Sequence, residues 1–130
     1  MAQGSVTLHE ASEQLKPETI DRHRAIVSLM EELEAVDWYD QRVDAATDEE
    51  LRVILAHNRD EEKEHASMLL EWLRRRDAKL DETLRTYLFT DRPILQAEQA
   101  ADAAEDEAGA SGSDGSLGIG SLREEAGSLR

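Results

Sequence analysis

The residues with the clearest potential for chemistry are Glu62 and His65, which form a Glu-x-x-His motif. Residues at i and i+3 lie on one face of an α-helix, so this carboxylate and this imidazole can bind the same cation. The chain contains no cysteine, which excludes thiolate metal sites and iron–sulfur clusters. The motif therefore predicts a metal ion held by histidine and carboxylate side chains.

Glu32 is a third candidate ligand because it interrupts the apolar stripe of a predicted helix, as Glu62 interrupts another. The two stripes follow the i, i+3/i+4 spacing of one helical face and comprise Ala25, Leu29, Glu32, Val36, Tyr39 and Val43, and Leu51, Leu55, Asn58, Glu62, His65, Leu69 and Trp72. An ionised carboxylate buried alone in a helical core costs several kcal/mol or becomes protonated. A bound cation removes that cost, so acidic residues in these stripes favour a metal site.

Proline and capping signals indicate two long helices that position these residues. Pro17 suits the first position of a helix that we expect to end near Ala45. The segment 47–50 reads as a capping box with Thr47 as the N-cap and Glu50 at N3, and the second helix should end near Arg76. Because the link is so short, the helices should form an antiparallel hairpin. Glu32 and Glu62 lie at nearly equal distances from the turn, so they should sit at the same level along the hairpin.

The expected fold class is all-α: an antiparallel two-helix hairpin, half of a four-helix bundle, completed by dimerisation. A folded part that consists mostly of one hairpin buries too little apolar surface to be more than marginally stable alone. A two-fold axis is the simplest way to place two hairpins face to face. Two hairpins supply two copies of Glu32 and two Glu62-x-x-His65 pairs, which is the ligand set of di-iron carboxylate bundles. One hairpin alone has too few ligands for two metal ions.

The rest of the chain is weaker in helical signals. Residues 77–89 predict a weaker helical segment, residues 94 to about 107 predict a short Ala-rich helix after Pro93, and Gly and Ser dominate beyond. The expected parts are a flexible N-terminal segment (1–16), the two-helix domain (17–98), a linker (99–113) and a disordered tail (114–130).

The chain is strongly acidic, with 30 acidic and 15 basic residues and a formal net charge of −15. Phosphate binding needs a basic face, so this charge argues against a nucleic-acid partner. An acidic surface concentrates cations, although solubility alone also explains such a charge. The sequence shows neither a secretion signal nor an apolar run that could span a bilayer, so we expect no membrane partner, and these features alone leave the compartment open.

Two segments around the candidate ligands, residues 31–39 (EELEAVDWY) and 57–65 (HNRDEEKEH), resemble the encapsulated ferritin family. The resemblance continues through residues 71–75 (EWLRR) and 84–89 (LRTYLF) and covers roughly residues 17–95. It implies two-helix, ferritin-like subunits that form dimers and a ring-shaped decamer.

The resemblance also implies an activity. Glu32, Glu62 and His65 match the ligands of a di-iron centre formed between two subunits, where a ferroxidase oxidises Fe(II) to Fe(III). The oxidised iron is then stored inside an encapsulin shell, so the expected location is the lumen of such a nanocompartment.

Residues near these ligands match further features of the family. Glu31 and Glu34 match a site through which metal enters, beside Trp38, and calcium or another divalent cation is a candidate occupant. Tyr39 matches a residue close to the di-iron centre, so we expect it to be a catalytic residue together with Glu32, Glu62 and His65. Without the family, an ordinary exposed acidic turn explains Glu31 and Glu34, and core packing explains Tyr39.

The tail carries an independent resemblance. Residues 114–123 (DGSLGIGSLR) resemble the peptide that docks cargo proteins inside encapsulin shells. By this resemblance Leu117, Ile119 and Leu122 dock in a groove of the shell protein. Composition alone is also consistent with a Gly/Ser tail that carries scattered apolar residues.

Other classes of function use the same sequence features. A rubrerythrin-like di-metal peroxidase can use the same ligands, a structural metal clasp can hold a dimer without turnover, and a helical adaptor needs no metal. In a further alternative, Glu62 pairs with Arg59 or Lys63 on a solvated face, and the chain then has no metal site. No role is assigned to His57.

Overall fold

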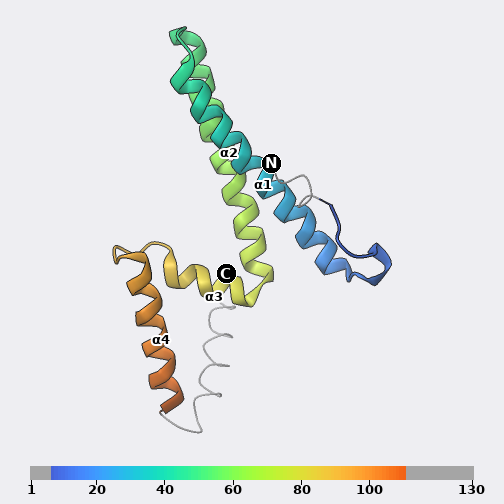
Figure 1. The fold of residues 1–130 in the computed structure, drawn as a ribbon, viewed down its shortest axis with the longest axis vertical. Coiled ribbons are helices and arrows are strands. Elements are labelled where there is room, and N and C mark those ends of the chain that lie inside the picture. Colours follow the sequence, from blue (N-terminus) through green and yellow to red (C-terminus); the bar gives the residue numbers. More distant parts are fainter. Residues whose placement is uncertain (1–6, 111–130) are drawn as a thin grey trace. The chain divides into compact units, whose positions relative to one another are not determined.

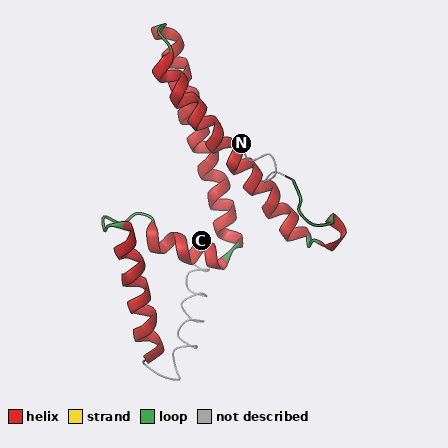
Figure 2. Ribbon diagram, viewed as in Figure 1, coloured by secondary structure: helices red, strands yellow, loops and turns green. Residues whose placement is uncertain are grey.

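The computed structural model describes residues 7–110, and these residues form an all-α fold, as expected. The elements are a short 3-10 helix η2 (Ser12–Gln14) and the helices α1 (Pro17–Ala45), α2 (Glu49–Arg76), α3 (Ala78–Tyr87) and α4 (Ile94–Ala110) (Figure 1). The described part contains helices and loops and no strand (Figure 2). The chain divides after Asp81 into two compact units, and the first contains the α1–α2 hairpin.

Helix α1 begins where proline predicts. Pro17 is the first helical residue, a position at which its missing amide hydrogen leaves no bond unmade. The N-cap, Lys16, contributes no side-chain hydrogen bond, but its carbonyl accepts from the amides of Thr19 and Ile20 at 3.0 and 3.1 Å. The predicted bounds of this helix, Pro17–Ala45, are confirmed.

The start of α2 corrects one prediction. The N-cap is Asp48, not Thr47, and Asp48 Oδ2 accepts a hydrogen bond from the amide of Leu51 at 2.8 Å. Aspartate caps helices better than threonine does, and its charge also favours the positive end of the helix dipole. The capping box with Thr47 and Glu50 is therefore wrong by one residue, whereas the end of the helix at Arg76 is as predicted.

Helices α1 and α2 pack against each other as an antiparallel hairpin (Figure 1). The most deeply buried residues of these two helices are Ala25 of α1 and Ala66 and Leu73 of α2. The helices lie side by side near the turn and diverge toward the beginning of α1 and the end of α2. Because none of the described large side chains is fully buried, one hairpin alone has no complete core.

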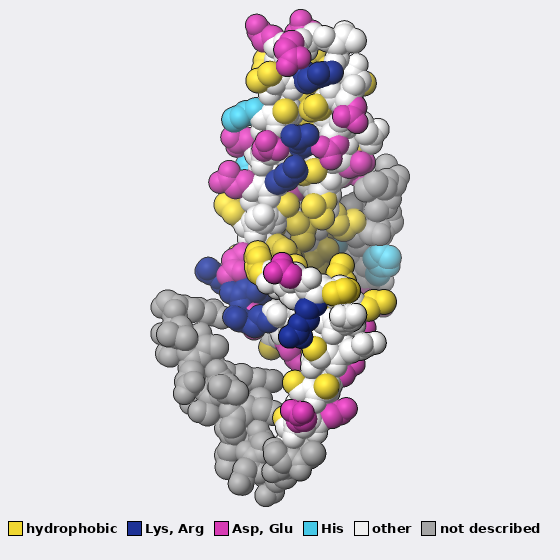
Figure 3. Space-filling view, turned by 90° about the vertical axis from the view of Figure 1, so that its left-hand side faces the viewer, with side chains coloured by type: hydrophobic (Ala, Val, Ile, Leu, Met, Phe, Trp, Pro, Cys, Tyr) yellow, Lys and Arg dark blue, Asp and Glu magenta, His cyan; other side chains and the backbone are white. Residues whose placement is uncertain are grey.

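The hairpin leaves many large apolar side chains in contact with water. Figure 3 shows one face of the chain, on which hydrophobic side chains gather between charged ones. The exposed apolar residues of the hairpin are Ile26, Leu33, Trp38, Leu51, Val53, Ile54 and Met68. Extended apolar surface of this kind marks a protein contact. It fits the expectation that a second hairpin completes the bundle.

Helix α3 is tied to the end of α2 by its first residues. Asp77 Oδ1 accepts from the amide of Leu80 at 3.0 Å and so caps α3. Arg74 of α2 donates to both Glu71, at 2.7 Å, and Asp81 in the first turn of α3. The expected weaker helical segment thus becomes a short helix whose first turn is held by charge pairs.

The second unit contains the end of α3 and all of α4. Phe89, which follows α3, has a positive φ of 59° and a fully exposed side chain. The carbonyl of Pro93 accepts from the amides of Gln96 and Ala97 at 2.9 and 3.2 Å and starts α4. This helix extends to Ala110, so residues 99–110 of the expected linker are helical.

Two expectations fall on parts of the chain outside residues 7–110. The tail 114–130, with Leu117, Ile119 and Leu122, lies outside the described residues, as do the first six positions of the N-terminal segment. Within the described residues, none of the helices combines the length and the apolar character of a membrane span.

Candidate metal centre

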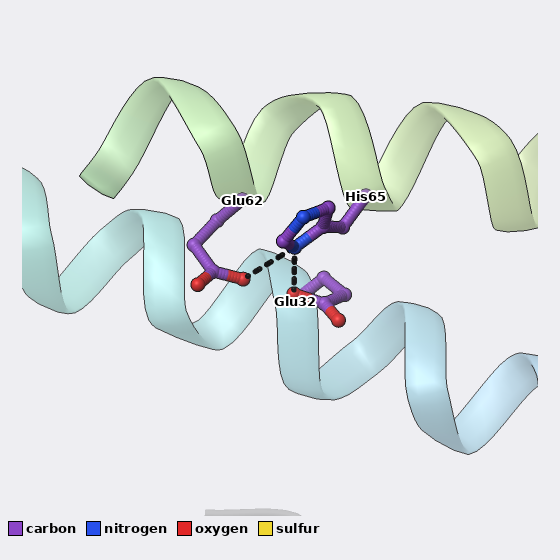
Figure 4. A group of neighbouring side chains, drawn as sticks. All are labelled: Glu32, Glu62 and His65. Carbon is purple, nitrogen blue, oxygen red and sulfur yellow. Dashed lines mark hydrogen bonds and ion pairs between the residues drawn. The ribbon is translucent and has the colours of Figure 1, made fainter. Parts of the chain in front are cut away.

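Three side chains converge where α1 and α2 face each other. Glu32 comes from α1, and Glu62 and His65 come from α2 (Figure 4). One ligand atom from each residue lies within 4.8 Å of the other two. His65 Nδ1 lies 3.4 Å from Glu62 Oε2 and 3.6 Å from Glu32 Oε2. The equal spacing of these residues from the turn therefore brings them to the same level, as expected from the sequence.

The three side chains are accessible rather than sealed in a core. The exposed fraction is 26% for Glu32, 23% for Glu62 and 42% for His65. No Lys or Arg forms an ion pair with any of them among the pairs that the described residues make. Two carboxylates and one imidazole thus face each other without a permanent cation, an arrangement that suits a bound metal ion.

The electrostatics of the cluster show how the protein tolerates this crowding. A hydrogen bond with Glu62, together with partial burial and repulsion from the Glu62 charge, raises the pKa of Glu32. Glu62 accepts that hydrogen bond, and its pKa is lowered. Partial burial opposes the charge on His65, but the two carboxylates outweigh this effect and raise the pKa of His65. The raised pKa values of Glu32 and His65 mean that a cation competes with protons for these two ligands.

The surrounding charges rule out the alternative that Glu62 is part of an ordinary solvated ion pair. Arg59 donates to Asp40 of α1 at 3.1 Å and to Asp60 at 3.2 Å. Lys63 lies 3.6 Å from Asp60. Both basic residues thus pair with aspartates, and the predicted alternative partners of Glu62 are wrong.

The other predicted site residues lie on α1 but outside this cluster. Glu31 is exposed and Glu34 is half-buried, and neither belongs to a cluster of three or more potential metal ligands in the described residues. Trp38 and Tyr39 share one neighbour: the guanidinium of Arg42 lies 5.9 Å and 5.4 Å from the centres of their rings.

A groove next to the cluster was missed by the sequence analysis. It has a volume of about 660 Å³ and extends from the cluster into the space where α1 and α2 diverge. Its lining residues are Asp21, Arg24, Ala25, Ser28, Glu32, His65, Met68, Leu69 and Trp72. The i, i+3, i+7 spacing of the α2 residues His65, Met68 and Trp72 was the available signal, but only the divergence of the helices opens the groove.

The cross-helix pair of Arg59 and Asp40 was also missed. It joins α2 to α1 on the side of the cluster that faces the turn. The exposed fraction of the Arg59 side chain is 24%, which shows that this arginine lies along the hairpin rather than in open solvent. Its only signal in the sequence was that Asp40 and Arg59 have opposite charges and each follow a member of one of the two facing stripes, Tyr39 and Asn58.

An all-α hairpin with two carboxylates and an imidazole on facing helices defines the class as ferritin-like. Residues 7–91 match the sequence profile of the EncFtn-like family, and the chain belongs to that family.

Two curated relatives agree with this assignment. An "Encapsulated ferritin-like protein" of Rhodospirillum rubrum is 67% identical over 132 aligned positions, which cover 97% of this chain and 94% of the relative. A "Ferritin-like protein" of Thermotoga maritima is 53% identical over 111 positions, which cover 85% and 93% of the two chains.

A solved structure supports the fold. A crystal structure of a protein from Nitrosomonas europaea aligns with a TM-score of 0.65 and 63% sequence identity. The alignment covers 67% of this chain and 96% of that one. Identity at this level makes the shared fold secure for the aligned part.

Proposed function

We propose that this protein is a ferroxidase that oxidises Fe(II) to Fe(III) at a di-iron centre formed between two subunits. The observation that carries the proposal is the convergence of Glu32, Glu62 and His65, whose ligand atoms lie within 4.8 Å of one another. Oxygen and imidazole ligands suit iron, and the absence of cysteine leaves no competing thiolate chemistry. Membership of the EncFtn-like family supports an iron-related role.

The centre requires a second copy of the chain. One hairpin contributes three ligands, whereas two metal ions need about twice that number. The cluster is partly exposed, and apolar side chains such as Leu33 and Met68 are more than half exposed in one chain. Pairing two hairpins about a two-fold axis covers this apolar surface and completes the ligand set. Dimers arranged in a ring-shaped decamer are the proposed assembly.

The ligands favour the oxidised product. Carboxylates are hard anionic ligands that bind Fe(III) more tightly than Fe(II), so they promote loss of an electron to an oxidant. Glu32, Glu62 and His65 would hold the iron ions in the proposed centre, and the two carboxylate oxygens of Glu62 would allow it to bind both ions. Iron binding requires ionised carboxylates and a neutral imidazole, so the raised pKa values of Glu32 and His65 make protons its competitors. Two iron ions together deliver two electrons.

Residues on the far side of α1 are proposed to supply the substrate. Glu31 and Glu34, beside Trp38, attract Fe(II), calcium or another divalent cation at the surface before iron reaches the centre. Tyr39, which follows Trp38 and is half-buried, is proposed to lie close to the di-iron centre.

The proposed destination of the iron is an encapsulin shell. A relative that is 67% identical carries the description "encapsulated". Leu117, Ile119 and Leu122 are proposed to dock on the inner surface of the shell protein, with the ferroxidase in the lumen of a cytoplasmic nanocompartment. Co-expression with a shell protein tests this: deletion of residues 114–130 should abolish loading, and unchanged loading would remove the proposal.

An anaerobic titration with Fe(II) followed by admission of O2 tests the activity. Ferric absorbance should develop in the parent protein and be lost in assembled Glu32→Ala and Glu62→Ala variants. Glu64→Ala, an exposed change on the same helix, is the matched control and should behave as the parent does. Parent-like oxidation by the Glu32 and Glu62 variants would overturn the proposal. Metal-dependent assembly without oxygen consumption would identify a structural clasp instead.

A further inference from the structure

A thioether lies beside the cluster and has no part in the proposed metal binding. Met68 follows His65 by three residues on α2 and lines the same groove as His65 and Glu32. Its side chain is 59% exposed. The only other methionine in the described residues, Met30 of α1, is half-buried and does not line this groove.

The position of Met68 keeps it close to the centre. Side chains at i and i+3 of a helix are neighbours, with about 5–6 Å between their Cβ atoms. This relationship is built into α2 and persists whichever way a second hairpin closes over the cluster. The groove is also lined by Ala25 and Ser28 of α1 and by Leu69 and Trp72 of α2. Met68 carries the only sulfur among these lining residues, so a peroxide in the groove has a thioether within reach beside the ligands.

Thioethers react readily with peroxides, whereas most other side chains do not. The chain contains three methionines and no cysteine, so no thiol competes for an oxidant. Among the described residues, Met68 combines a reactive sulfur with proximity to the candidate metal ligands, and neither property depends on its exposure in a single chain.

We propose that Met68 is an oxygen-accepting residue that intercepts hydrogen peroxide released at the cluster and becomes methionine sulfoxide. The inference rests on the proposed ferroxidase function for its source of peroxide. Two Fe(II) ions each lose one electron, and O2 takes up both electrons and two protons to give hydrogen peroxide. The Met68 sulfur then attacks one peroxide oxygen, the O–O bond breaks, a sulfur–oxygen bond forms, and the second oxygen leaves as water. Sulfur is oxidised by two electrons, and peroxide is reduced by two.

This reaction protects the centre. Peroxide that accumulates near Fe(II) damages protein ligands, whereas oxidation of one thioether consumes it stoichiometrically. Methionine sulfoxide is reversible by reductase enzymes, so the same residue can be restored and used again.

The test uses the full-length assembled protein, loaded with Fe(II) without oxygen and then exposed to O2 in the presence of catalase in the surrounding solution. Peptide mass spectrometry should find one added oxygen atom on Met68 and an unmodified Met30. Catalase removes peroxide from bulk solution, so persistence of the Met68 modification shows delivery within the protein. Equal oxidation of both methionines, or loss of Met68 oxidation when catalase is present, would overturn the inference.

Ferric absorbance and oxygen consumption, recorded on the same samples, separate this inference from the proposed function. Normal iron oxidation with unmodified Met68 overturns the role of Met68 alone, whereas absent iron oxidation overturns both. A second measurement uses Met68→Leu, which conserves volume. Peroxide escaping into solution per iron oxidised should rise in the first turnovers of this variant and stay at the parent level in Met30→Leu. An unchanged ratio in Met68→Leu would contradict the inference.

Discussion

The Nδ1 atom of His65 on α2 lies 3.6 Å from the Oε2 atom of Glu32 on α1. The two residues are separated by more than thirty positions in the sequence, and only the antiparallel hairpin brings them together. With Glu62 one turn away from His65, this contact turns two separate helix faces into one ligand cluster. Its chemistry can be tested through binding, pH and stability.

Removal of one carboxylate should weaken metal binding. Glu62→Gln keeps the size of the side chain but removes its charge and alters its hydrogen bond with Glu32. We expect Co(II), a redox-stable substitute for Fe(II), to bind the variant about 10- to 100-fold more weakly, since even changes behind the direct ligands reach that range. Isothermal titration calorimetry measures the affinity, with Glu64→Gln as the control. An affinity within two-fold of the parent would exclude Glu62 as a ligand.

Metal binding should strengthen as the pH rises. The two carboxylates raise the pKa of His65 above its ordinary value of 6.5, so more of the imidazole is protonated near neutral pH than in a free histidine. A cation must displace that proton, and binding should therefore release protons and weaken as the pH falls. Co(II) titrations in buffers of different ionisation enthalpy measure the released protons. Binding that is independent of pH around 6.5 would contradict this prediction.

The metal-free protein should show the opposite trend. Because the folded pKa of His65 is raised, its charged form contributes stability that is fully present below pH 6.5 and is lost as the pH rises through the folded value. Thermal unfolding of the metal-free parent and of His65→Gln should therefore differ more at acidic than at alkaline pH. A difference that grows with rising pH would show that the sign is wrong.

Of the two residues that could cap α2, only Asp48 should contribute to the stability of the protein. Asp48→Ala removes the hydrogen bond from the amide of Leu51 and should lower the free energy of unfolding by about 1 kcal/mol. Thr47→Ala is the matched control, because Thr47 forms no cap in the structure. Chemical denaturation followed by circular dichroism measures both. A larger loss in Thr47→Ala than in Asp48→Ala would restore the capping box that the sequence suggested.

The end of α2 should lose stability in acid. Hydrogen bonds from Arg74 and Arg75 lower the pKa of Glu71 from 4.5 to about 2. The ionised form of Glu71 therefore contributes stability that is fully present above pH 4.5 and is lost as the pH falls toward 2. Acid unfolding of the parent should be steeper in this range than that of Glu71→Gln, which has no proton to bind. Parallel acid titrations would contradict the prediction.

The local features of the sequence were sufficient for the helices and the ligand trio. The bounds of α1 and the end of α2 follow from Pro17 and from the basic last turn before Asp77, because proline geometry and helix dipoles act within one turn. The Glu62-x-x-His65 spacing defines a shared face for the same reason. Glu32 could be paired with them because, in an antiparallel hairpin with a short link, residues at equal distances from the turn lie at the same level.

Features that depend on long-range packing could not be predicted in this way. Asp48 rather than Thr47 caps α2 because the exact path of the short link decides which side chain reaches the amide of Leu51. The pairing of Arg59 with Asp40 depends on how the two helices are rotated about their axes, which periodicity leaves open.

By itself, the amino-acid sequence determined the two helices, their antiparallel pairing and the residues that meet between them, because these follow from local geometry and from counting along the chain. Only the tertiary structure decided that α1 and α2 diverge, that a groove opens beside His65, and that Met68 lines it. The reason is physical: the angle between two helices is set by the sum of many side-chain contacts, and no single spacing in the sequence encodes that sum.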